Sequence, residues 1–194
     1  MKFLPIFIAL VFLADQVIAQ KQISCLYTAV SKHEINGCKK VPYLVANPQI
    51  TKQKGKLTIP MPGRAAQILK DDHSDEYFHE FEYLGDLRST MLSLVKRTDY
   101  HHETFYLINR ASGRIDTLIG LPVFAGNLRD FACINNPGTD EKQQIQTGTI
   151  KNGSVAQVNF IKPLSGIFIT GIACVTKNSL LITGDKDDYW KINF

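Results

Sequence analysis

The stretch QIQTGTI-KNGS-VAQVNFI, residues 144–161, decides the fold class. Two seven-residue runs, 144–150 and 155–161, flank the four residues Lys151-Asn152-Gly153-Ser154. Asn-Gly between two such runs is the strongest short-range signal for a tight hairpin turn. The stretch therefore predicts two antiparallel strands joined by that turn.

Similar short runs recur on both sides of this hairpin and are separated by turn-forming residues. We expect strands at 56–59, 77–83, 104–108, 115–119, 123–124, 131–134, 167–175, 180–183 and 189–192. Short strands at this spacing indicate an all-β antiparallel fold. We predict one such domain over residues 20–194, built as a sandwich or as an incomplete propeller-like sheet.

One segment, 86–96, is ambiguous between helix and strand. Leu87, Met91 and Leu94 fall at helical spacing behind an acidic cap residue. Leu92 and Leu94 fit a strand equally well. The strands predicted on either side favour the β interpretation.

The first 19 residues have the order of a secretory signal. A basic residue, Lys2, precedes the apolar run 3–13, and small or modest side chains follow at 17–19. We expect cleavage after Ala19, at the end of these small side chains. The apolar run is too short to span a bilayer, so a retained membrane anchor is the weaker interpretation. The protein is therefore predicted to be secreted or periplasmic, with no membrane span after the signal is removed.

The chain has four cysteines, Cys25, Cys38, Cys133 and Cys174. An even number in an exported protein is compatible with two disulfides, and three pairings are open. Proximity favours Cys25 with Cys38, which leaves Cys133 to pair with Cys174. The alternative for the second pair is two buried thiols in neighbouring strands.

Two of these cysteines, Cys133 and Cys174, lie in similar short sequences, which is a weak sign of an internal repeat. Ala-Cys-apolar triplets occur at 132–134 and 173–175, roughly 40 residues apart, which is near the period of a propeller blade. Repeat architectures need at least three matching units, and only two are found. Chance reuse of a strand pattern is the favoured explanation.

Residues 105–124 read FYLINRASGRIDTLIGLPVF, which is a strand, a Ser-Gly turn, a second strand and a Pro-apolar-Phe strand. This order resembles a segment of secreted proteins from Bacteroidetes-type bacteria. The resemblance implies blade-like sheets, and it implies no catalytic residue.

Histidines and carboxylates gather in two places, and together they raise a metal-site hypothesis. A divalent-metal hydrolase would use His73, His79, His101 and Glu103 as ligands, with Glu80 or Glu103 as the base. The chain lacks a His-Glu-x-x-His motif, and adjacent strand residues point to opposite faces. An acidic, solvated loop is therefore the favoured explanation.

Other chemistries find no motif in this chain. It has neither a Gly-x-Ser-x-Gly nucleophile turn nor a glycine-rich phosphate loop, so no cofactor is predicted. The formal net charge of +4 is mild, and the basic residues are scattered. Nucleic-acid binding is not expected, because it would need a concentrated basic face.

The function that the sequence favours is non-catalytic binding by an exported module. The partner would be an extracellular or periplasmic protein or a glycan, and self-association is a further option because open sheets leave edge strands. Loops are expected to present the binding surface, namely 71–76, 99–103 and 135–143. The expected binding residues are Tyr77, His79, His101 and Trp190. An aromatic stripe such as the one over 77–83 is, however, more typical of a core wall.

Overall fold

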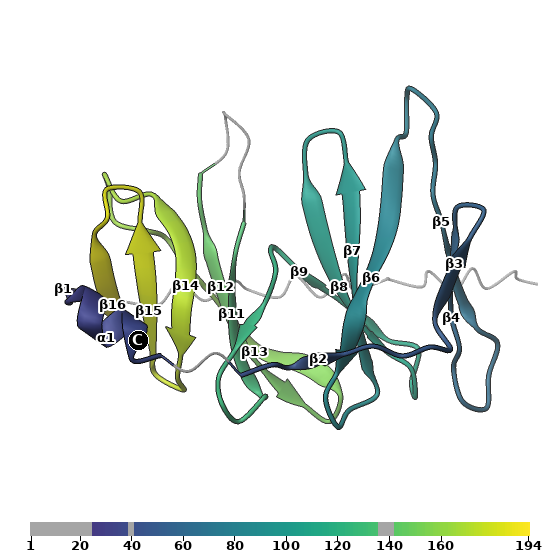
Figure 1. Cartoon of the computed structure of the whole chain (residues 1–194), viewed down its shortest axis with the longest axis horizontal. Helices are drawn as coiled ribbons and strands as arrows, with labels where there is room; N and C mark the ends of the chain where they lie inside the picture. The colour runs from purple at the N-terminus through teal and green to yellow at the C-terminus, as the bar shows by residue number, and fades with distance from the viewer. Residues whose placement is uncertain (1–24, 39–40, 136–141) are drawn as a thin grey trace, which may run out of the picture.

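A computed structural model of the chain describes residues 25–38, 41–135 and 142–194 (Figure 1). The predicted signal segment, 1–19, lies outside these described residues. Within the described part, no helix is both long enough and apolar enough to cross a membrane.

The chain folds into four antiparallel sheets that follow one another in sequence order. Sheet I contains β3 (Thr51–Gln53), β4 (Lys56–Ile59) and β5 (Gln67–Lys70). Sheet II contains β2 (Leu44–Val45), β6 (His79–Leu87), β7 (Leu92–Asp99), β8 (Glu103–Asn109) and β9 (Ile115–Leu118). Sheet III contains β10 (Val123–Phe124), β11 (Asp130–Ile134), β12 (Ile145–Lys151) and β13 (Ser154–Ile161). Sheet IV contains β14 (Ile169–Val175), β15 (Ser179–Gly184), β16 (Tyr189–Asn193) and, from the other end of the chain, β1 (Leu26–Ala29).

The predicted all-β antiparallel fold is confirmed, and its four sheets are arranged in a row (Figure 1). Each sheet is built largely from consecutive strands and packs face to face against the next sheet in the row. The hairpin predicted for residues 144–161 is present as β12 and β13, with Lys151 opposite Ser154. Asn152, at φ 53°, takes up the left-handed conformation that such a turn requires.

Three apolar cores lie between successive sheets. Because side chains alternate between the two faces of a strand, neighbouring residues of one strand contribute to different cores. On β7, Val95 packs in the core between sheets I and II, while its neighbour Leu94 packs between sheets II and III. On β11, Phe131 faces sheet II and Ala132 faces sheet IV. Sheets II and III are thus buried on both faces, which accounts for their continuous apolar runs.

Segment 86–96 is strand, turn and strand, so the β interpretation is confirmed. β6 ends at Leu87, the chain turns through Ser89 at φ 59°, and β7 begins at Leu92. The helical spacing misleads because Leu87 and Leu94 share one core from two different strands, while Met91 is exposed in the turn.

The predicted disulfide pairing is wrong. Cys38 is bonded to Cys174, with 5.8 Å between their Cα atoms, so neither Cys25–Cys38 nor Cys133–Cys174 forms. β11 and β14 do pack together, but Cys133 points away from β14 into the core between sheets II and III. Cys174 lies opposite Leu181, which alternates with the core residues Leu180 and Ile182 and so faces away from sheet III.

The bond places α1 (Lys32–Asn36) against sheet IV (Figure 1). This short helix has a capping box, in which the Ser31 hydroxyl accepts from the Glu34 N–H and the Glu34 carboxylate accepts from the Ser31 N–H. A five-residue helix is not stable on its own, so its position depends on the disulfide and on packing. Of the second predicted pair, Cys133 is a buried free thiol, as the alternative expected.

Candidate functional site

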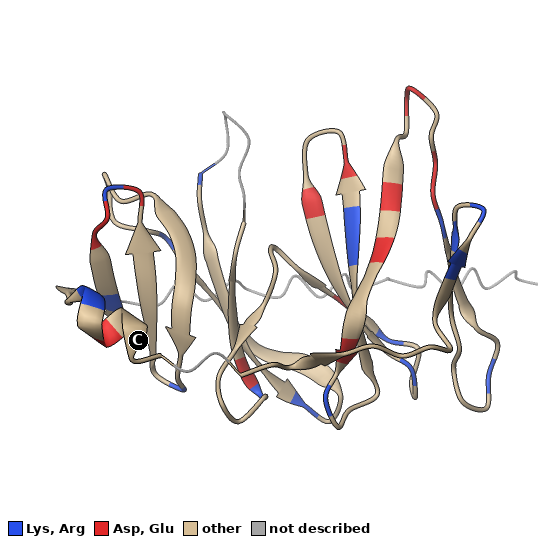
Figure 2. Ribbon diagram, in the orientation of Figure 1, with Lys and Arg blue, Asp and Glu red and all other residues tan. Residues whose placement is uncertain are grey.

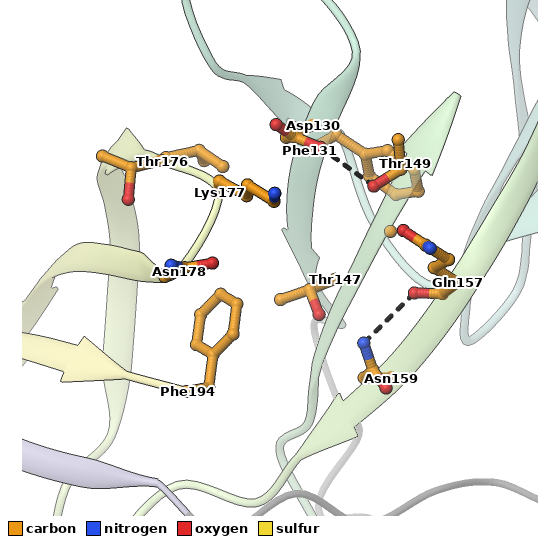
Figure 3. Close-up of a pocket in the computed structure, with 12 residues that line it drawn as sticks. Asp130, Phe131, Thr147, Thr149, Gln157, Asn159, Thr176, Lys177, Asn178 and Phe194 are labelled. Carbon is orange, nitrogen blue, oxygen red and sulfur yellow. Dashed lines mark hydrogen bonds between the residues drawn. The ribbon is translucent and has the colours of Figure 1, made fainter. Parts of the chain in front are cut away.

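A cavity of about 300 Å³ lies between sheets III and IV (Figure 3). Strands β11, β12 and β13 form one wall, and the turn between β14 and β15 forms the other together with Phe194. The lining consists of Asp130, Phe131, Thr147, Gly148, Thr149, Gln157, Asn159, Val175, Thr176, Lys177, Asn178 and Phe194.

The cavity begins where the apolar core between these two sheets ends. On β12, Ile145 belongs to that core, but the next residue on the same face is Thr147. Its cross-strand neighbour on β13 is Asn159, which is also polar. The inward face of the hairpin therefore changes from apolar to polar, and the side chains of the two sheets leave a cavity between them there.

The hydroxyl of Thr147 is the most unusual group in this wall. The residue is only 5% exposed, and its Oγ1 has no hydrogen-bond partner among the described residues. A buried polar atom left unpaired costs about 1–3 kcal/mol. Figure 3 shows Thr147 between the two walls, next to the ring of Phe194.

A β-bulge beside Thr147 changes the direction in which the side chains of β13 point. Thr147 pairs with Asn159 and Thr149 with Ala156, so two residues of β13 lie opposite the single residue Gly148. The bulged residue Gln157 has φ 52°, a left-handed conformation that costs a non-glycine residue about 1–2 kcal/mol. Bulges of this kind commonly orient side chains beside functional sites.

The charges in the lining are few and offset each other. Asp130 has both carboxylate oxygens engaged, because Oδ1 accepts from Thr149 Oγ1 at 2.9 Å and Oδ2 accepts from Asn127 Nδ2 at 2.7 Å. Lys177 lies exposed in the opposite turn. The remaining polar lining is amide and hydroxyl, and these groups both donate and accept hydrogen bonds. The lining thus presents hydroxyl and amide groups that can hydrogen-bond a ligand.

Three of the sequence-predicted residues lie together at one end of sheet II. Tyr77 is 62% exposed, and His79 begins β6 opposite Asp99 of β7. The loop carrying His101 meets the loop before β6, where the rings of Phe78 and Tyr100 are 4.9 Å apart. β7 lies between β6 and β8, however, so His79 is not adjacent to the strand that begins at Glu103.

The histidines of this loop pair do not form a metal site. His79 has its Nδ1 2.8 Å from the Tyr77 carbonyl oxygen and its Nε2 3.1 Å from the Lys70 carbonyl oxygen. Neither nitrogen can offer a lone pair to an ion without losing one of these contacts. His73 lies 3.6 Å from a carboxylate oxygen of Glu80. Across the described residues, no three His, Cys, Asp or Glu side chains are placed to hold a metal.

The carboxylates near these histidines are engaged in cross-strand ion pairs. In Figure 2 a basic segment of β7 lies between acidic segments of β6 and β8. Lys96 on β7 has its Nζ 2.9 Å from a carboxylate oxygen of Glu82 and 3.6 Å from one of Glu103. These groups are mostly exposed, so the pairs add little stability. Glu103, a predicted metal ligand, therefore has a lysine as its neighbour.

Trp190 lies far from these loops, in sheet IV. It is half-buried against the core between sheets III and IV, and its indole N–H donates to Asp188 Oδ2 at 3.0 Å. Phe81, in the predicted aromatic stripe, is a core residue, whereas Tyr77 is an exposed loop residue. The predicted loop 135–143 lies largely outside the described residues.

Sequence reasoning missed the cavity residues. Thr147 and Asn159 face each other in the β12–β13 hairpin. Their polar side chains at positions that face the neighbouring sheet were the one feature of the sequence that could have pointed to the cavity. No family model matches this chain, and comparison with curated proteins and with solved structures finds no match either. The function must therefore be argued from the geometry of the chain itself.

Proposed function

We propose that this protein is a non-catalytic binding module of the secreted or periplasmic space, and that the cavity between sheets III and IV is its ligand site. The observation that carries the proposal is the buried, unpaired hydroxyl of Thr147 in the cavity wall. Native proteins satisfy nearly all buried polar groups, so such an exception calls for a partner. A bound ligand would supply it once the Thr147 side chain turns its hydroxyl toward the cavity, because the oxygen has almost no exposed surface in its present position.

Backbone strain at the same place supports the proposal. Gln157 keeps a left-handed conformation that glycine would adopt without cost, and it lines the cavity. A strained backbone conformation persists where the rest of the fold holds the residue in place, and such residues cluster at ligand sites. The wall itself consists of paired strands, which hold side chains more firmly than loops do.

The Cys38–Cys174 disulfide supports the compartment part of the proposal. Disulfides persist in oxidising spaces and are rare in the cytosol. The signal segment 1–19 remains a prediction from sequence. N-terminal sequencing of the exported protein tests it, and a first residue of Gln20 is expected.

The test of the binding site is a matched pair of valine variants. Thr147→Val keeps the side-chain shape and removes the unpaired hydroxyl, while Thr58→Val makes the same change on β4 of sheet I. The probes are mixed saccharides, amino acids, nucleosides, phosphate and short fatty acids. Binding is followed by the ¹H–¹⁵N amide shifts of the cavity residues.

We expect at least one probe class to shift the cavity amides in the wild type and in Thr58→Val, and to bind more weakly to Thr147→Val. Thr147→Val should also unfold at an equal or higher denaturant concentration than the wild type when no ligand is present, because its unpaired buried hydroxyl is gone. A wild type that responds to none of these probes, or a Thr147→Val variant that binds normally, would contradict the proposal.

A further inference from the structure

The polar groups of the cavity match the hydrogen-bonding pattern of one class of ligand. Gln157, Asn159 and Asn178 contribute primary amides, and Thr147 contributes a hydroxyl once its side chain turns toward the cavity. The Asn159 Nδ2 also donates to the Gln157 carbonyl oxygen at 3.1 Å, which leaves its second N–H and its Oδ1 for a ligand. Each of these groups can donate and accept at once. Ligand hydroxyls have the same dual capacity, so a hydroxyl-rich ligand can satisfy several of these side chains together.

The charge of the lining argues against an ionic ligand. The carboxylate of Asp130 already accepts hydrogen bonds from Thr149 and Asn127, one on each oxygen. Lys177 is exposed in a turn, where a single flexible charge binds an anion weakly. The two formal charges of the lining cancel, which favours a neutral ligand.

An aromatic ring provides the apolar surface that such a ligand also needs. In Figure 3 the ring of Phe194 stands beside Thr147 and Asn178, facing the space between the two walls. The Phe194 N–H donates to the Asn178 carbonyl oxygen at 3.0 Å, and the side chain packs partly on the core between the sheets. A fixed aromatic face gains from covering a flat apolar surface.

We infer that the cavity binds a neutral sugar ring, with its hydroxyls on the amides and Thr147 and its C–H face on Phe194. This inference rests on the proposed binding function and names the ligand class of the same site. The volume of about 300 Å³ is at the lower end of the range for ligand pockets, so one or two rings fit and a longer glycan continues outside.

The experiment titrates the protein with glucose, galactose, N-acetylglucosamine and their short oligomers, by calorimetry and by the side-chain amide shifts of Gln157, Asn159 and Asn178. Glycine, inorganic phosphate and octanoate are the non-sugar probes. Thr147→Val and Phe194→Ala are the cavity variants. Thr58→Val and Phe168→Ala are their controls, and Phe168 is an exposed phenylalanine just before β14, at the strand end away from the cavity.

We expect at least one sugar to bind the wild type and both controls. The loss of one hydrogen bond in Thr147→Val should weaken that binding by roughly threefold to tenfold, and Phe194→Ala should weaken it as well. Sugar binding that neither cavity variant changes would overturn the inference, since the site would lie elsewhere.

The failure of this inference can be told apart from the failure of the proposed function. If a non-sugar probe binds in a Thr147-dependent way and no sugar does, the sugar assignment is overturned and the binding function stands. If no probe shifts the cavity amides, both are overturned.

Discussion

Arg110 Nη2 donates a hydrogen bond to Asp86 Oδ2 over 2.7 Å, and both side chains are buried. The same carboxylate accepts from Asn47 Nδ2 at 2.9 Å, from the Tyr83 hydroxyl at 2.9 Å and from Ser93 Oγ at 2.7 Å. Four donors thus satisfy one carboxylate, and they come from β6, from β7 and from the segments next to β2 and β8. This network joins β6 and β7 to the segments that follow β2 and β8, so it links four neighbouring strands of sheet II.

Replacing Asp86 with Ala should reduce the free energy of unfolding by about 3–5 kcal/mol, because it leaves the Arg110 charge buried without a partner. Urea unfolding measures the change. The control is Arg114→Ala, which removes an exposed partner of Asp116 and should cost about 1 kcal/mol or less. Equal losses in the two variants would argue against the network.

The Cys38–Cys174 bond closes a loop across most of the chain, with a sequence separation of 136. In the chain-entropy model, a loop of that size stabilises the fold by about 4–5 kcal/mol. The double variant Cys38→Ser/Cys174→Ser should lose a comparable amount in urea unfolding. Non-reducing peptide mapping should recover the Cys38 and Cys174 peptides joined, and a Cys25–Cys38 peptide would contradict the structure.

Cys133 should resist alkylation in the native protein. Burial raises the pKa of its thiol to about 12, and the residue is 0% exposed. The reactive thiolate is therefore scarce at neutral pH and shielded from the reagent. Iodoacetamide labelling followed by mass spectrometry should modify Cys133 only after denaturation. Rapid native labelling of this residue would show that its core between sheets II and III opens.

Asp71 should make the protein sensitive to acid. Burial alone would raise the pKa of Asp71, but hydrogen bonds from Lys52 Nζ at 2.6 Å and from the Phe81 N–H at 2.9 Å lower it below its ordinary value of 3.8. A lowered folded-state pKa stabilises the protein above the unfolded pKa, and this contribution is lost as the pH falls through the folded pKa.

Asp71→Asn is therefore expected to be less stable than the wild type at neutral pH, by about 1–3 kcal/mol for the loss of a charged hydrogen-bond acceptor. The difference should shrink as the pH falls below about 4, where Asp71 is protonated first in the unfolded chain and then, at a lower pH, in the folded protein. Unfolding free energies across this range measure the effect. A difference that stays constant with pH would mean that Asp71 does not act through its charge.

Gly148→Ala should disturb the cavity wall, because a Cβ there would lie 2.7 Å from the ring of Phe131. Overpacking of this kind costs about 1–3 kcal/mol and displaces neighbouring backbone. Gly126→Ala is the matched control, since nothing lies within 4 Å of its added Cβ. Thermal unfolding of both variants, with the amide shifts of Gln157, should show a change for Gly148→Ala alone.

The elements of this fold were readable from the sequence because they depend on local patterns. The Asn152-Gly153 turn and the runs on either side of it predict β12 and β13 without knowledge of any other strand. Segment 86–96 needed its neighbours, since its apolar residues fit a helix and a strand equally well. The predicted binding residues were split, with Tyr77, His79 and His101 at one end of sheet II and Trp190 in sheet IV.

By itself the sequence determined the antiparallel class, most strands of sheets II, III and IV and the turns between them, because alternation and turn chemistry act over a few residues. It did not reveal the strands β1, β2, β3 and β5 or the helix α1, which are all short. The tertiary structure decided the disulfide partners and the cavity. Cys133 and Cys174 occur in similar strands, but the two-residue period turns Cys133 toward sheet II, while Cys174 meets Cys38. Thr147 is an ordinary strand residue in the sequence, and it becomes a buried, unpaired hydroxyl only because sheet IV packs over that face without filling it. Such contacts join residues far apart in the chain, and no local pattern encodes which sheet faces which.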